Sequence, residues 1–376
     1  MATDLLRRRL IAALSSGGLL AAYPMLAHAA RRAPDANAHA LLTCWNDSPT
    51  RPASFRAGRL DTPSSALELP ARGHDIAWHP AADGSAVVAA RRPGSFLVRW
   101  HVASGTELAR FETDDESRFE GHLAFRPDGR VLYATETDLI SGDGRVGVFD
   151  ALSLKRLDAW PCGGIGPHAV KWMADGRLAV ANGGILTLPE TGRVKRNLDR
   201  MDPSLSFIDP QSRRLLTQHR LPDAFMSVRH IAQTRAGHIA VSLQNEGEVG
   251  RPLFALLDGE RLRYGEADAD LVEHCGGYAG DIAAIDDAFA VSCTRAGVTA
   301  MWSSAGLPGP VLPTPKVCAI TSFQGRLRAT GGGGDIWDVA VNAAASAGGL
   351  AATLIKHEQL PVALDNHACS AEFPAS

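Results

Sequence analysis

Several signals of known protein classes are missing from this chain of 376 residues. It has no C-x-x-C motif, which argues against a thioredoxin-like redox site, and no C-x-x-C-H motif, which argues against covalently attached haem. It has no G-x-S-x-G motif, so nothing predicts the nucleophile of a serine hydrolase. Helical periodicity is nearly absent after the first 30 residues, which argues against an α-helical fold.

A surplus of charge is also missing. The chain has 38 Lys and Arg against 41 Asp and Glu, giving a formal net charge of −3. Without a basic surplus we expect no nucleic-acid partner. Aromatic residues make up only 6%, whereas 37 glycines and 22 prolines favour many turns.

No apolar run is long enough to predict a permanent transmembrane helix. Residues 1–29 instead read as an export signal, with Arg7, Arg8 and Arg9 before a short apolar run and a small-residue site at Ala27-His28-Ala29. The paired arginines favour the twin-arginine route over an ordinary Sec signal. We therefore expect a periplasmic protein, exported as a precursor, without stable membrane insertion.

Short β-type runs separated by turn residues recur along the rest of the chain, and they are in register with a repeated position. That position begins or precedes the first run of each unit, and it holds histidine five times in seven. Its occupants are His74, His122, His168, His230, Asp281, Cys318 and His367.

The spacing of these seven units, about 49 residues on average, is typical of four-stranded propeller blades. Gly84, Gly129, Gly176, Gly237 and Gly325 follow the repeated position at 7–10 residues, where a hairpin turn is expected. The last unit has one strand only, so strands from residues 40–72 must complete it. Residues 30–376 are thus predicted to form one all-β, seven-bladed β-propeller, closed by N-terminal strands that join the C-terminal strand.

Six cysteines suit an oxidising compartment but are too sparse for a disulfide scaffold. Cys44 and Cys369 are expected on neighbouring strands of the closing blade. A disulfide or two buried thiols would both fit there.

The first strand of each propeller blade lines the central channel, so the repeated histidines should form a ring at one rim. Neutral imidazole is a common ligand of Zn, Cu, Fe and Ni. We therefore predict a transition-metal site, for iron or copper, made by His74, His122, His168, His230 and His367.

Further polar residues are expected at the same rim, either at the repeated position or where each second strand ends. Candidates for the metal's outer contacts are Asp75, Glu136, Asn182, Gln244, Glu246, Asp281 and Cys318. Others at the rim are Asn46, Asp47, Arg91, Arg92, Asp138 and Arg295.

Two alternatives stay open. Duplication of one ancestral blade can copy a structural histidine, in which case the propeller would be a docking scaffold. A metal at the rim could also activate water in a hydrolase or lyase, with Glu136 as base. The absence of a catalytic signature favours a protein that is not an enzyme.

The segments "GHLAFRPDGRVLYATETD", "GGIGPHAVKWMADGRLAVANGGI" and "RVKRNLDRMDPSLSFID" resemble the exported bacterial family catalogued as domain of unknown function 1513. The resemblance implies a propeller of the YVTN or WD40 type. It also implies a periplasmic iron-uptake system with imelysin-like or di-haem proteins as partners. Ala169 stands where the family usually has an acidic residue after Gly-Pro-His.

Overall fold

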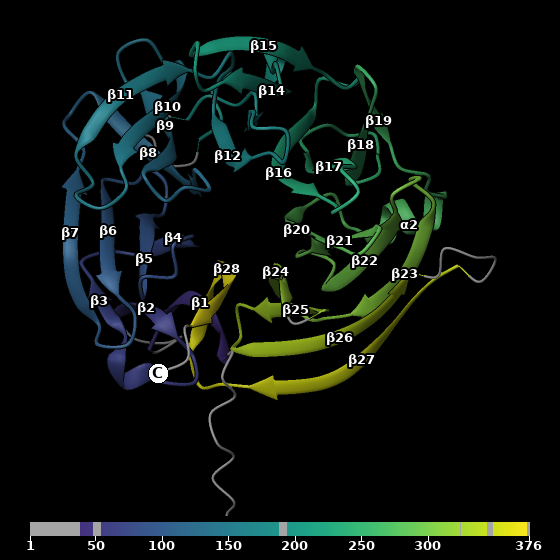
Figure 1. The fold of residues 1–376 in the computed structure, drawn as a ribbon. Helices are drawn as coiled ribbons and strands as arrows, with labels where there is room; N and C mark the ends of the chain where they lie inside the picture. Colours follow the sequence, from purple (N-terminus) through teal and green to yellow (C-terminus); the bar gives the residue numbers. More distant parts are fainter. Residues whose placement is uncertain (1–37, 48–53, 188–193, 324, 344–348, 374–376) are drawn as a thin grey trace, which may run out of the picture. The chain divides into compact units, whose positions relative to one another are not determined.

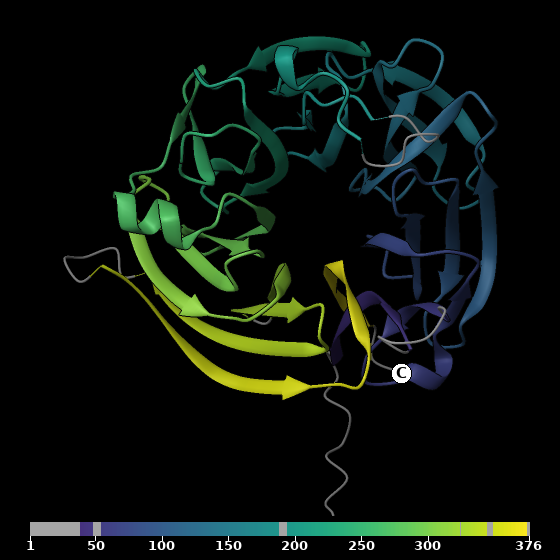
Figure 2. The ribbon, with the colours of Figure 1, turned by 180° about the vertical axis from the view of Figure 1, so that it is seen from behind.

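Seven four-stranded antiparallel sheets form a ring around a central channel in the computed structural model (Figure 1). The structure describes residues 38–47, 54–187, 194–323, 325–343 and 349–373. The predicted export signal lies outside these residues. The view from behind shows the same closed circle of sheets (Figure 2). The predicted all-β, seven-bladed propeller is therefore confirmed.

Six of the seven sheets take their strands in chain order, from the channel outward. The first four sheets that follow this rule are β4 (Gly73–Trp78), β5 (Ser85–Ala90), β6 (Phe96–His101) and β7 (Thr106–Glu112); β8 (Ser117–Phe125), β9 (Val131–Asp138), β10 (Gly144–Asp150) and β11 (Arg156–Pro161); β12 (Pro167–Trp172), β13 (Leu178–Asn182), β14 (Ser204–Asp209) and β15 (Arg214–His219); and β16 (Met226–Gln233), β17 (Ile239–Asn245), β18 (Phe254–Asp258) and β19 (Arg261–Tyr264).

Two more sheets obey the same order. They are β20 (Ala279–Ile285), β21 (Ala288–Cys293), β22 (Val298–Ser303) and β23 (Pro308–Pro313), then β24 (Val317–Phe323), β25 (Arg326–Gly331), β26 (Asp335–Ala343) and β27 (Leu350–Gln359). The described helices are short: α2 (Ala269–His274) and two 3-10 turns, η1 (Pro63–Ser65) and η3 (Leu198–Arg200). No described helix is long and apolar enough to cross a membrane.

The seventh sheet joins the two ends of the chain. Its inner strand is β28 (Ala363–Phe373), and β1 (Ala38–Asn46), β2 (Phe55–Arg59) and β3 (Leu67–Leu69) follow outward. β28 pairs with β1 in an antiparallel ladder, Leu42 opposite Cys369. In Figure 1 the yellow β28 lies beside the purple β1. The predicted closure of the ring is confirmed, and Cys44 and Cys369 are both free thiols.

The second strands of several sheets are nearly continuous apolar runs. β5 (SAVVAA), β13 (LAVAN) and β21 (AFAVSC) are buried along their whole length. These strands have neighbouring sheets on both faces, and this is why their sequences are nearly continuous apolar runs rather than alternating ones. Apolar clusters between neighbouring sheets hold the ring together, and one of them extends across the sheets that begin with β12, β16 and β20.

The five predicted turn glycines lie where expected, between first and second strands. Gly84, Gly129, Gly176, Gly237 and Gly325 all have positive φ, between +70° and +97°. Only glycine adopts this backbone conformation without strain, so the hairpins depend on these positions.

Candidate metal centre

The repeated position lies at a β-bulge in all seven inner strands. In β12, for example, the pairing with β13 slips between Pro167 and Val170, leaving His168 and Ala169 outside the ladder. Equivalent slips occur at or beside the other six anchors. A bulge redirects a side chain out of the regular alternation. Here the slips accompany side chains that face the centre of the channel.

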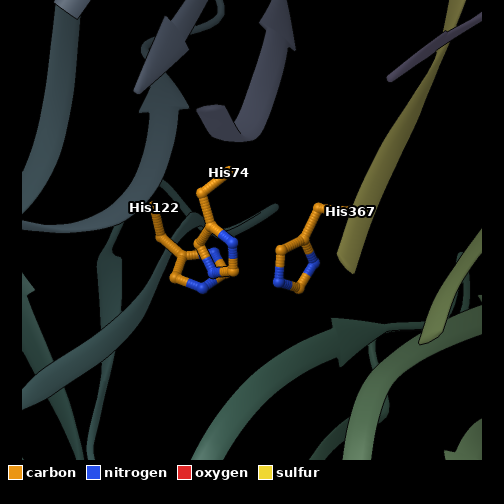
Figure 3. A group of neighbouring side chains, drawn as sticks. All are labelled: His74, His122 and His367. Carbon is orange, nitrogen blue, oxygen red and sulfur yellow. The ribbon is translucent and has the colours of Figure 1, made fainter. Parts of the chain in front are cut away.

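Five imidazole rings meet there. His122 is the hub of the group, because its ring centroid lies 4.6–5.1 Å from those of the other four histidines. Those four are His74, His168, His230 and His367. Figure 3 shows the rings of His74, His122 and His367 close together, on strands that come from different blades. We call these five residues the histidine cluster.

The histidine cluster is buried. Its five residues are only 4–7% exposed, so they lie inside the channel rather than at the open rim that the sequence predicted. Three of the five histidines are not at strand starts: His122 is the sixth residue of β8, and His230 and His367 are the fifth residues of β16 and β28.

Acidic side chains orient three of the rings. The Nδ1 atoms of His74, His122 and His367 lie 3.3, 3.5 and 3.4 Å from carboxylate oxygens, which belong respectively to Asp365, Asp75 and Asp281. An ionised carboxylate can only accept a hydrogen bond, so Nδ1 carries the proton in these rings. The lone pair is then on Nε2, which is the arrangement of carboxylate–histidine–metal triads.

The remaining two rings face each other. The Nε2 atoms of His168 and His230 are 3.1 Å apart, and Ser242 Oγ lies 3.2 Å from Nδ1 of His230. Metal–nitrogen bonds of about 2.0–2.1 Å put two nitrogens on one ion roughly 2.9–3.4 Å apart. The observed spacing fits two ligands of a single ion. Nε2 of His122 is buried and has no hydrogen-bond partner among the described residues.

Three overlapping groups of side chains bring their ligand atoms within 4.8 Å of one another. They are His74–His122–His367, His122–His168–His230 and His230–Asp281–His367. Two of the groups share His122, and three are enough protein ligands for a metal that keeps an open position.

Burial sets the protonation of the cluster. It lowers the pKa of His74, His122, His168 and His230, and neighbouring histidines add to the effect. These four rings are therefore neutral at pH 7, as ligands must be. Burial also lowers the pKa of His367, but Asp281 and other carboxylates outweigh it, and the pKa is raised.

Asp75 is the best supported of the predicted outer residues. Burial alone would raise its pKa, but His122, His367 and the Leu123 amide hold it below the usual value. Its two oxygens accept hydrogen bonds from the backbone amides of Ile76 and Leu123. Asp281 accepts hydrogen bonds from the backbone amides of Ile282 and Ile320 and faces His367, so it also belongs to the cluster's surroundings.

The structure places other predicted residues away from the cluster. Glu136 forms a bidentate pair with Arg156 at 2.8 and 3.0 Å, and Asn182 hydrogen-bonds the carbonyl of Cys162. Cys318 is a buried thiol near Thr294. These three side chains do not join the histidines, contrary to expectation.

Gln244 and Glu246 also have partners of their own. Gln244 donates to the carbonyl of Ala279, and Glu246 pairs with Lys195 and with Arg229. Arg229 is buried, and burial together with Arg92 lowers its pKa to about 10. Both arginines belong to the channel on the side where the inner strands begin.

Two important residues were missed. Asp365 fixes His74 and pairs with Arg72, yet it lies two residues before an anchor, where the repeat offers no counterpart. Lys171 follows His168 by three residues and lines the channel on the side where the inner strands end. The sequence signal that could have indicated Lys171 is the alternation of side chains between the two faces of β12 beyond its bulge.

Comparison with known proteins identifies the family of the chain. The model of the family described as "Protein of unknown function (DUF1513)" matches residues 67–371. No curated protein matches the chain.

Two solved structures are similar in fold. Hydrazine synthase of Kuenenia stuttgartiensis has a TM-score of 0.54 and 15% identity, over 71% of this chain and 76% of that one. The Dos1 propeller has a TM-score of 0.54 and 11% identity, over 86% of this chain and 88% of that one. At such identities the likeness shows the fold alone.

Proposed function

Because the chain belongs to the DUF1513 family of proteins of unknown function, its activity must be inferred from its own residues, and we propose that it binds a transition-metal ion in the histidine cluster. The observation that carries the proposal is the pairing of buried imidazoles with carboxylates behind them. A buried ring nitrogen normally has a hydrogen-bond partner. In His122, Nδ1 faces Asp75, whereas Nε2 is buried without a partner among the described residues and is free to bind a metal.

Iron is the ion that we assign first, with copper as the alternative. Imidazole suits both metals, and the resemblance of the sequence implies an iron-uptake system. On the same ground we place the protein in the periplasm, where it would hold the ion or pass it to another protein. The hydrolase or lyase reading loses support, because Glu136, its named base, is engaged by Arg156.

Elemental analysis of the exported protein, purified without chelator, tests the proposal. We expect near-stoichiometric iron or copper, and none in a folded variant with His122→Ala, His168→Ala and His230→Ala. His238→Ala is the matched control, because this histidine is exposed on the surface and pairs with Asp287 outside the channel. A folded parent protein that binds none of the ions offered at micromolar concentration would overturn the proposal.

A docking role is the second candidate, and one surface feature favours it. Val194, Phe225 and Val249 are 60%, 44% and 58% exposed. Their segments are connected by hydrogen bonds and an ion pair: Glu246 pairs with Lys195 and its amide donates to the carbonyl of Phe225, and Asn245 donates to the carbonyl of Val249. A partner such as an imelysin-like or di-haem protein would bind there. Co-purification lost in Phe225→Asp but kept in the triple histidine variant would support this role.

A further inference from the structure

A cavity of about 340 Å³ adjoins the histidine cluster on the side where the inner strands end. His122, His230 and His367 line it, together with Lys171, Gln233 and Thr321. One water molecule takes up about 30 Å³ in the liquid, so the space can hold a ligand of several atoms. A metal on these three histidines would be open to whatever occupies the cavity.

Lys171 faces this cavity without a close partner. It forms no hydrogen bond and no ion pair within the part of the chain that the structure describes. Burial lowers its pKa, and only the longer-range attraction of Asp281 and Asp75 opposes that. Lys171 is half-buried, and an ammonium group that is partly withdrawn from water and lacks an acceptor carries a desolvation cost. A ligand that accepts its hydrogen bonds would remove that cost.

The two acidic residues of the cavity are directed to groups other than Lys171. Asp75 accepts from the amides of Ile76 and Leu123 and faces His122. Asp281 accepts from the amides of Ile282 and Ile320 and faces His367. Both carboxylates are held toward the histidines, and Lys171 is left to the cavity.

The balance of charges around the channel also favours an anion in the cavity. The carboxylates near the cluster are Asp75, Glu120, Glu246, Asp281 and Asp365, and the cations are Arg72, Arg91, Arg92, Lys171, Lys195 and Arg229. A divalent ion would add two positive charges to a set that is already not negative. Uncompensated charge is costly in a buried site, and Lys171 would repel the ion across the same cavity.

We propose that a small anion with oxygen donors, a phosphate or a carboxylate, binds in this cavity between the metal and Lys171. One oxygen would complete the coordination of the metal, and another would accept a hydrogen bond from the ammonium group. The inference rests on the proposed metal site. It deepens that function, because the loaded protein would then bind the metal and the anion together and each would raise the affinity for the other.

Cobalt(II) provides the test, since its visible absorption reports the ligands around it. The protein is loaded with cobalt and titrated with inorganic phosphate and, separately, with acetate. We expect a saturable spectral change in the parent protein and, with the stronger anion present, tighter cobalt binding. Whichever anion gives the change at the lower concentration identifies the chemistry of the ligand.

Variants at Lys171 assign the change to the cavity. Lys171→Met should weaken anion binding about tenfold or more, because a charge-assisted hydrogen bond is lost, and Lys171→Arg should restore most of it. Lys155→Met, at an exposed turn, should behave like the parent protein. Cobalt stoichiometry shows at the same time whether each variant is folded and loaded.

The failures can be told apart. A parent protein that takes up no cobalt overturns the metal site and the anion site with it. A parent protein that binds cobalt but shows no change with either anion overturns the anion site alone. Equal anion affinity in the parent protein and Lys171→Met overturns the role of Lys171.

Discussion

His122 differs from the other four histidines because its ring lies beside all of them, and it differs from His74 and His168 because two of the candidate metal-binding groups share it. Without it only His230–Asp281–His367 remains, whereas loss of His168 leaves His74–His122–His367 intact. Loss of an outer contact typically reduces metal affinity by 10–100-fold, so His122→Ala should cost more than about 100-fold, and His168→Ala clearly less. Competition with a chelator of known affinity measures both. Equal losses would contradict the hub position of His122.

Protonation should make the metal-free protein sensitive to mild acid. Four cluster histidines have a folded-state pKa below the usual 6.5, so below about pH 6.5 the unfolded chain binds protons that the folded chain does not. Stability contributed by these groups is then lost as pH falls. His367, with its raised pKa, has the opposite sign but is one group against four.

We therefore expect the free energy of unfolding, measured with urea in the presence of a chelator, to fall by about 3–5 kcal/mol from pH 7.5 to 5.5. A variant with both His168→Ala and His230→Ala should lose roughly half of this pH dependence, since two of the four responsible groups are gone. A flat pH profile in the parent protein would show that the cluster is accessible to protons after all.

At the scale of the strand, the β-bulges determine which side chains face the centre of the channel. The sequence identified the seven units because the anchors and the turn glycines recur at regular spacing. It did not show the bulges, because a slip in register is a property of two paired strands and not of either one alone. Counting from an anchor across a bulge assigns the second strand to the wrong face. Glu136 was expected at the channel because the second strand ends there, but side chains near a strand end still alternate between two faces, and Glu136 pairs with Arg156.

Gly121 allows one of these bulged strands to pass close to a histidine. It has φ +105°, and a Cβ atom there would lie 2.6 Å from Cδ2 of His74. Gly176 is a matched control, with φ +85° and no atom within 4 Å of an added Cβ. In urea unfolding we expect Gly176→Ala to cost about 1 kcal/mol for backbone strain and Gly121→Ala about 3 kcal/mol. Metal binding should weaken only in Gly121→Ala, and similar behaviour of the two variants would contradict the close packing against His74.

On the scale of the whole molecule, ring closure and the metal site depend on the same strand. A chain that ends at residue 361 lacks β28, and with it His367, Asp365 and the inner edge of the seventh sheet. We expect it to be aggregated, because the channel-facing edge of β1 is then unpaired. A chain that ends at residue 373 is the control. A soluble 361-residue chain with native near-ultraviolet circular dichroism would show that six sheets suffice.

The position of β28 at the end of the chain also fixes when an ion can first be bound. The ribosome makes His74, His122, His168 and His230 long before His367, and the ring that brings them together closes only with the last strand. A nascent chain that has not yet made β28 therefore lacks the complete histidine cluster, and we expect any ion to be selected after that strand is made. For a protein that crosses the membrane already folded, as the expected twin-arginine signal implies, the choice of ion would be made from the metals of the cytoplasm, before the protein reaches the compartment where it acts.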